Sequence, residues 1–116
     1  MKALEWMGDS LDTLKGFPHE VTQPICFALY SVQCGEVPLN AKPLKGTGGV
    51  FEIVQSFDKE TYRAVYIAKL KNAVYVLHCF QKKSKSGKKT PPRDTNLIKQ
   101  RLKEARQRDK EVEKEL

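Results

Sequence analysis

Residues 50–80 read VFEIVQSFDKETYRAVYIAKLKNAVYVLHCF, and this stretch sets the architecture of the chain. Three runs dense in Val, Ile, Tyr and Phe lie at residues 50–57, 62–69 and 73–80. Only short polar segments connect these runs, whereas two parallel strands would need a crossover of about a dozen residues or more. The stretch therefore predicts a three-stranded antiparallel meander.

The middle run places a charge on one face of that meander. Successive side chains of a strand point to opposite faces of the sheet. Arg63 therefore shares a face with Val65 and Ile67, whereas Tyr62 and Ala64 point the other way. The pattern predicts a guanidinium that is held on a rigid sheet face.

The chain before the meander begins with a short strand and a brief helix. Residues 2–7 are apolar enough for a strand, and Gly8-Asp9-Ser10 then supplies capping chemistry for a helix that runs to about Gly16. Residues 37–49 are rich in Pro and Gly and read as a long ordered loop in front of the meander.

A second helix is predicted between these segments, and Gly35 ends it. Its apolar positions recur at the spacing of one buried helical stripe: Val21, Ile25, Ala28, Leu29 and Val32. Pro24 lacks a backbone donor and crowds the preceding turn. We therefore expect either a kink at Pro24 or a helix that begins near it.

Residues 81–94 read QKKSKSGKKTPPRD and hold no acidic side chain before Asp94. The formal net charge of +7 lies wholly in residues 81–116, because eight basic residues balance eight acidic ones in residues 1–80. A one-sided positive field of this kind is typical of a polyanion binder, and the alternative is a solubilising basic tail. The compactness of the run favours contact with nucleic acid.

The C-terminal residues predict a charged helix over residues 91–115. Thr90 can cap this helix, and Pro91 and Pro92 are tolerated at its first positions because their missing donors would be unpaired there in any case. A narrow apolar stripe runs along it: Ile98, Leu102, Ala105 and Val112.

Length and composition predict one domain, residues 1–116, since 116 residues with 40% hydrophobic content can bury a core without staples. No signal sequence or membrane span is apparent, so we expect a cytoplasmic protein without a membrane partner. Cys26, Cys34 and Cys79 have no metal-ligand spacing. They fit reduced thiols buried as small hydrophobes, and no metal or other cofactor is predicted.

Five sequence strings, in this order of elements, carry a resemblance: AKPLKG, FEI, TYRAVYI, VYVLHCFQKK and KTPPRD. Together they make the chain similar to the RelE/ParE toxin superfamily, in particular to the HigB-like, phage-derived branch of type II toxin–antitoxin toxins. The resemblance implies an α+β fold: an antiparallel sheet of about four strands, with an N-terminal helical hairpin packed on it and a C-terminal helix. It also implies ribosome-dependent cleavage of messenger RNA without a metal, restrained by a small antitoxin, usually a helix-turn-helix protein.

The chemistry of such cleavage can be compared with the residues. Attack by a ribose 2′-oxygen needs removal of its proton, stabilisation of the phosphorane and protonation of the departing 5′-oxygen. Arg63 suits the phosphorane, and the resemblance implies an active-site arginine at this position. Lys82 and Lys83 follow the third strand. Either one could orient the phosphate or transfer a proton, or could simply be solvated.

Two further candidates have two interpretations each. His78 titrates near neutrality and could be a general acid or base, although its apolar neighbours favour a packed, hydrogen-bonded residue. Phe80 could stack on a base or pack in the core. The remaining predicted RNA contacts are basic side chains of the two loops and of the last helix: Lys42, Lys45, Lys85, Lys88, Lys89 and Arg93.

The chain also departs from the family pattern. No tyrosine follows Tyr75, although many RelE-type relatives have one shortly after the basic cluster, and Ser86-Gly87 lengthens the basic loop. These departures leave an alternative open. The same fold could serve as a non-catalytic module that holds nucleic acid or a partner protein in a phage or mobile element.

Overall fold

The computed structural model describes residues 1–82 and 90–115. In chain order its elements are β1 (Ala3–Trp6), α1 (Ser10–Lys15), α2 (His19–Gln33), β2 (Ala41–Pro43), β3 (Val50–Phe57), β4 (Glu60–Ile67), β5 (Ala73–Lys82) and α3 (Pro92–Glu115). The predicted α+β class is confirmed. No helix within the described part of the chain is both long enough and apolar enough to cross a membrane.

The sheet has five strands in the order β1-β5-β4-β3-β2. Strands β3, β4 and β5 form the predicted antiparallel meander. Two details of the prediction were wrong. Strand β1 pairs with β5 in parallel, so the sheet is mixed. Strand β2 lies inside the predicted loop, where a run of three residues that includes Pro43 is too short to show alternation.

A two-residue turn joins β3 to β4 and sets their register. Asp58 and Lys59 have φ values of 51° and 66°, as the mirror-image turns of tight hairpins require. Phe57 therefore pairs with Glu60, and β4 begins two residues earlier than predicted. The same register places Arg63 opposite Val54.

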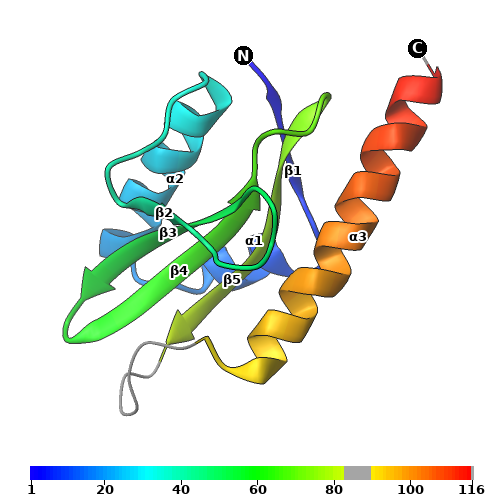
Figure 1. Ribbon diagram of the computed structural model, residues 1–116. Helices are drawn as coiled ribbons and strands as arrows, with labels where there is room; N and C mark the ends of the chain where they lie inside the picture. The colour runs from blue at the N-terminus through cyan, green and yellow to red at the C-terminus, as the bar shows by residue number, and fades with distance from the viewer. Residues whose placement is uncertain (83–89, 116) are drawn as a thin grey trace.

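Helices cover both faces of the sheet (Figure 1). Helix α2 packs Val21 and Ile25 against the face that carries Tyr62 and Tyr66. Helix α3 packs on the opposite face, where its apolar residues form one cluster with Val65, Ile67 and the β5 residues that point to this face. Arg63 lies on the α3 face, as the alternation along the strand predicts.

Several local predictions need correction. Helix α2 begins at His19 and continues through Pro24, so a start near Pro24 was wrong. Asp9 makes no side-chain cap for α1, because its carboxylate pairs with Arg101 instead. Cys26 and Cys34 are exposed, and of the three cysteines Cys79 alone is buried.

Helix α3 ends at Glu115 as predicted, but its first residue and its apolar stripe differ from the prediction. It begins at Pro92, so Pro91 rather than Thr90 precedes the first helical residue. Val112 is 37% exposed, whereas the charged Asp109 is 6% exposed and takes the buried position at this end of the stripe. A carboxylate can be buried there because it is fully hydrogen-bonded.

Asp109 holds α3 to the turn between β4 and β5. Its carboxylate accepts hydrogen bonds from the backbone N–H groups of Lys71 at 3.1 Å and Asn72 at 2.9 Å, and from the Tyr75 hydroxyl at 3.0 Å. Burial raises the pKa of Asp109, but the hydrogen bonds of Asn72, Lys71 and Tyr75 outweigh it and leave the pKa below its ordinary value.

The lowered pKa of Asp109 predicts a defined loss of stability in acid. A carboxylate whose pKa is lower in the folded state contributes stability above its unfolded pKa, and this stability is lost as the pH falls through the folded pKa. Asp109→Asn should reduce the free energy of unfolding at neutral pH by about 1–3 kcal/mol, since it weakens three buried hydrogen bonds. The Tm of this variant should also depend less on pH in the acid range than the Tm of the wild type.

Thermal unfolding followed by circular dichroism over acidic to neutral pH measures both effects. Glu113→Gln is the matched control, because Glu113 lies on the same end of α3 but is exposed, and it should leave the curves unchanged. A neutral-pH Tm equal to that of the wild type in Asp109→Asn would contradict the assignment.

Candidate active site

A cluster of three cations and one carboxylate lies on the α3 face of the sheet, each from a different strand. Lys42 is on β2, Glu52 on β3, Arg63 on β4 and Lys82 on β5. The strand pairing brings them together, because Lys42 pairs with Glu52 and Arg63 lies two residues along β4 from the partner of Glu52. Lys82 pairs with Thr61, two residues before Arg63.

Glu52 is the centre of this cluster. Its Oε1 accepts a hydrogen bond from Arg63 Nη1 at 2.5 Å, and Lys42 Nζ lies 3.6 Å from the same oxygen. Glu52, Arg63 and Lys82 are 3%, 8% and 6% exposed, whereas Lys42 is largely exposed. One carboxylate cannot neutralise three cations, so the cluster keeps a net positive charge.

Three buried polar atoms of the cluster have no hydrogen-bond partner among the described residues: Glu52 Oε2, Arg63 Nε and Lys82 Nζ. Two of them are donors with a positive charge. Burial and the nearby Arg63 guanidinium lower the pKa of Lys82, and Glu52 opposes this effect. The arrangement is therefore suited to an anion that can accept from both Arg63 and Lys82.

A groove of about 680 Å³ opens beside the cluster, between residues 42–47 and the first turns of α3. Glu52 contributes to its lining, together with Lys42 and Lys45 on one wall and Lys99 on the other. Arg63 and Lys82 are not among its lining residues and are nearly buried. Phosphate-bearing ligands would therefore meet Lys42, Lys45 and Lys99 before the buried pair.

His78 is part of a tie between β5 and α3. Its Nε2 lies 2.7 Å from Asp94 Oδ1, and its Nδ1 lies 3.2 Å from Arg101 Nη1. Because a guanidinium can only donate, Nδ1 accepts and the ring proton is on Nε2, directed at Asp94. This geometry matches the packed, hydrogen-bonded interpretation of His78, and its predicted catalytic role stays a prediction.

Arg101 extends the tie to the start of α1. It donates to the Leu77 carbonyl at 3.1 Å and to Asp9 at 2.8 Å, and this contact lowers the pKa of Asp9. Gly8 has a φ of 53°, and a Cβ there would lie 2.7 Å from the guanidinium of Arg101. The left-handed backbone at this position favours glycine, and a larger residue would displace the end of the Arg101 side chain.

The other predicted site residues are distributed as follows. Phe80 is 7% exposed and stacks on His78 with ring centroids 5.1 Å apart, so it packs in the core. Lys45 and Arg93 are exposed. Four predicted residues lie outside the described part of the chain: Lys83, Lys85, Lys88 and Lys89.

Three residues of this region were not predicted from the sequence: Glu52, Asp94 and Arg101. Glu52 is the single acidic residue of its strand, on the same alternation as the buried Val50, and this signal alone could have drawn attention to it. Within residues 1–82 and 90–115 no three His, Cys, Asp or Glu side chains are close enough to hold a metal ion.

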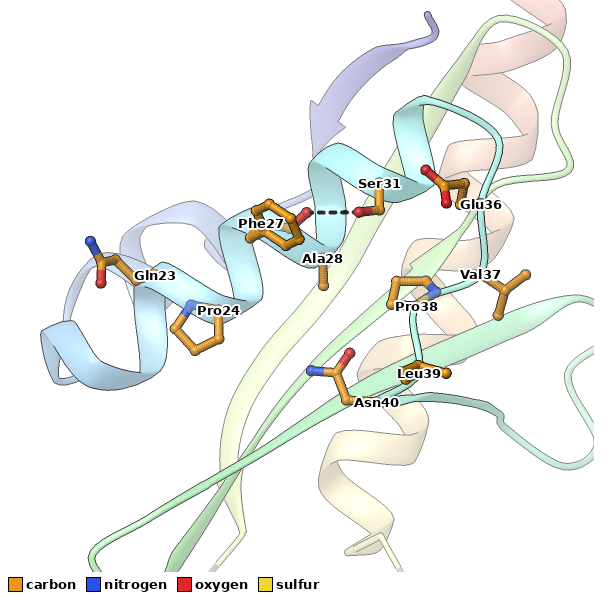
Figure 2. Close-up of a pocket in the computed structure, with 10 residues that line it drawn as sticks. All are labelled: Gln23, Pro24, Phe27, Ala28, Ser31, Glu36, Val37, Pro38, Leu39 and Asn40. Carbon is orange, nitrogen blue, oxygen red and sulfur yellow. Dashed lines mark hydrogen bonds between the residues drawn. The ribbon is translucent and has the colours of Figure 1, made fainter.

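A larger cavity, of about 890 Å³, has a different chemical character (Figure 2). Exposed apolar side chains of α2 and of the following loop form much of its lining, including Phe27, Val37 and Leu39. Its lining includes no cation, and Glu36 is its one charged residue. This chemistry does not suit a phosphate.

Comparison with known proteins gives two findings. Residues 12–103 match a family model described as phage derived protein Gp49-like (DUF891). The structure is similar to that of the E. coli toxin RelE, solved as a double mutant in the free state, with a TM-score of 0.56 and 19% sequence identity over 72% of this chain and 86% of that chain. No curated protein matches this chain significantly.

The buried amine of Lys82 predicts that the cluster reduces stability. A lysine whose pKa is lower in the folded state destabilises the fold while it is charged, and stability rises as the pH passes from the folded to the unfolded pKa. Lys82→Met keeps the unbranched shape and removes the charge. It should raise Tm at neutral pH, and the gain should shrink as the pH rises toward the ordinary pKa of lysine.

Differential scanning calorimetry at several pH values tests this expectation. Lys15→Met is the control, because Lys15 is exposed on α1 and should show no comparable gain. A lower Tm in Lys82→Met at neutral pH would show that the amine is stabilised by contacts with an oxygen atom.

Proposed function

The chain belongs to the phage-derived Gp49-like family, and from this premise we propose that it is the toxin of a type II toxin–antitoxin system that cleaves messenger RNA on the ribosome. The predicted membership of the RelE superfamily is confirmed by the family match and by the shared fold. The observation that carries the enzymatic part of the proposal is the buried cluster of Glu52, Arg63 and Lys82.

Arg63 is the proposed stabiliser of the transition state. The 2′-oxygen attacks the adjacent phosphorus, the bond to the 5′-oxygen breaks, and the products carry a 2′,3′-cyclic phosphate and a 5′-hydroxyl. Negative charge on the phosphoryl oxygens grows during this step. Arg63 donates one N–H to Glu52, and its Nε has no partner among the described residues. The guanidinium can therefore donate to the charged phosphoryl oxygens without movement of its strand.

Glu52 and Lys82 are the proposed proton-transfer residues. Glu52 Oε2 is a buried carboxylate oxygen without a partner among the described residues, as a general base that accepts the 2′-hydroxyl proton requires. Lys82 can return a proton to the departing 5′-oxygen, because a lowered pKa makes its ammonium group a stronger acid. His78 acts as a positioning residue that holds α3 beside this chemistry.

The partners belong to the same proposal. Messenger RNA in the ribosomal decoding site is the proposed substrate, and a small antitoxin with a helix-turn-helix domain is the proposed inhibitor. Both follow from the resemblance to HigB-like toxins. The net positive charge of the groove walls agrees with a polyanionic substrate.

One observation favours the alternative of a non-catalytic module. Tyr75 is buried and bound to Asp109, and Tyr62 and Tyr66 face α2, so none of these tyrosines reaches the cluster. A toxin that relied on a tyrosine near its basic loop would be inactive here. The cluster chemistry described above needs no tyrosine, and we therefore keep the enzyme as the main proposal.

Replacement of Arg63 tests the proposed function. Induced wild-type protein should arrest growth and produce new 5′-hydroxyl ends in ribosome-bound messages. Arg63→Gln should lower cleavage by about 100-fold or more, because it removes the charge that stabilises the phosphorane. Growth curves and mapping of 5′ ends measure the two effects.

Arg108→Gln is the control, since it removes the same charge from an exposed position of α3. It should remain as toxic as the wild type. If the wild-type protein neither slows growth nor yields new 5′ ends, the enzymatic proposal fails and the binding module is preferred.

The pH dependence of cleavage tests the proton transfers separately. Lys82 must be protonated to act as the acid, so the rate should fall as the pH rises through its pKa, which lies below the usual value for lysine. Lys82→Arg keeps the charge but cannot release a proton. It should therefore lower the cleavage rate about 10²–10⁴-fold and abolish the fall in rate at high pH, the basic limb of the profile. Glu52→Gln should lower the rate by a similar factor, because it removes the proposed base.

Single-turnover cleavage of a programmed ribosome over a range of pH gives these profiles. Lys99→Arg provides the matched control on the groove wall and should keep the basic limb. An unchanged basic limb in Lys82→Arg would exclude Lys82 as the proton donor.

A further inference from the structure

Helix α3 has a purely basic flank that the proposed cleavage chemistry does not use. At 3.6 residues per turn, its members fall within about 60° of the helix circumference. Four exposed side chains make up this basic flank: Lys99, Lys103, Arg106 and Lys110. The acidic side chains Glu104 and Glu111 lie on the far flank of the helix.

The basic flank faces the loop between β2 and β3. A groove of about 530 Å³ separates them, and Lys99, Lys103 and Arg106 line it on the helix side. Arg106 Nη2 donates to the Gly48 carbonyl at 3.5 Å. This groove shares Gly46, Thr47 and Lys99 with the groove beside Glu52, so the two grooves adjoin.

The acidic groups nearest the basic flank are already engaged. Asp109 is buried and holds the turn between β4 and β5, and Glu113 pairs with Lys71 at 2.5 Å. Asp94 binds His78 at the start of the helix. The positive field of the flank is therefore not cancelled locally, and the exposed Lys45 adds to it from the opposite wall.

We propose that the basic flank and residues 44–48 form a track for the backbone of the substrate RNA strand, leading away from the phosphate at Arg63. The inference rests on the proposed function and deepens it. From Lys99 to Lys110 the track is about 16 Å long at 1.5 Å per residue, enough for more than one nucleotide. Exposed cations on a rigid helix contact phosphates without reading bases, so the contact is independent of sequence and sensitive to salt.

A purely solubilising role and a protein partner both fit the basic flank less well than RNA does. A helix that serves only solubility intersperses both signs around its circumference, whereas here four cations share one flank with no acidic side chain among them. An acidic protein segment would also complement the flank. The three lining residues that the two grooves share favour a strand continuous with the scissile phosphate.

The test measures how tightly the wild type and a variant with less positive charge bind RNAs of two lengths. The variant carries Lys103→Gln, Arg106→Gln and Lys110→Gln, which are exposed positions outside the groove beside Glu52 where Gln retains helix propensity. The probes are fluorescent RNAs of about 4 and 12 nucleotides, within the range of single-strand site sizes, and methylated at every 2′-oxygen so that they cannot be cleaved. Anisotropy titrations over a salt series give the affinities.

For the longer RNA, the slope of log affinity against log salt should decrease by about 2, at about 0.7 per lost single-strand contact. The shorter RNA, held at Arg63, should bind with nearly unchanged affinity. A control with Lys15→Gln, Lys59→Gln and Arg108→Gln makes the same change of net charge at exposed positions away from the basic flank. It should bind both RNAs like the wild type.

Three results would overturn the track: no binding of the longer RNA by the wild type, equal losses in the variant and the control, or no loss in the variant. Because no cleavage is measured, failure of the proposed enzymatic function would leave these results decisive.

Discussion

Burial of the Arg63 guanidinium is the constraint around which the site is built. A permanent charge removed from water costs several kcal/mol unless a counter-ion and hydrogen bonds meet it. Glu52 meets it at 2.5 Å, and the register that the Asp58-Lys59 turn sets between β3 and β4 makes this contact possible. Helix α3 packs on this face of the sheet (Figure 1), and the two side chains are nearly excluded from solvent.

The neutralisation of this cluster is incomplete, and this makes it suitable for an anion. Lys42, Arg63 and Lys82 face one carboxylate, and the pKa of Lys82 is lowered by burial and by Arg63. Energy is thus stored in the free protein as unfavourable contact between like charges. A bound phosphate would release it, as expected where stability is given up for function.

Helix α3 links the stability of the fold to the site. Ile98 and Leu102 bury one face of the helix, and Asp109 and Arg101 fix its rotation through hydrogen bonds to distant turns and strands. Because the buried face sets the rotation, it also determines that the basic flank faces the loop between β2 and β3. The same packing therefore closes the core and orients the charges.

Local patterns in the sequence were enough to predict the α+β class, the meander, the basic character of the C-terminal third and the face on which Arg63 lies, since alternation and charge density are properties of neighbouring residues. They could not identify Glu52 as the partner of Arg63, the parallel pairing of β1 with β5, or the tie of His78 to Asp94 and Arg101. Each of these depends on which distant segments lie together. A counter-ion, the burial of a charge and the rotation of a helix arise only when strands and helices pack.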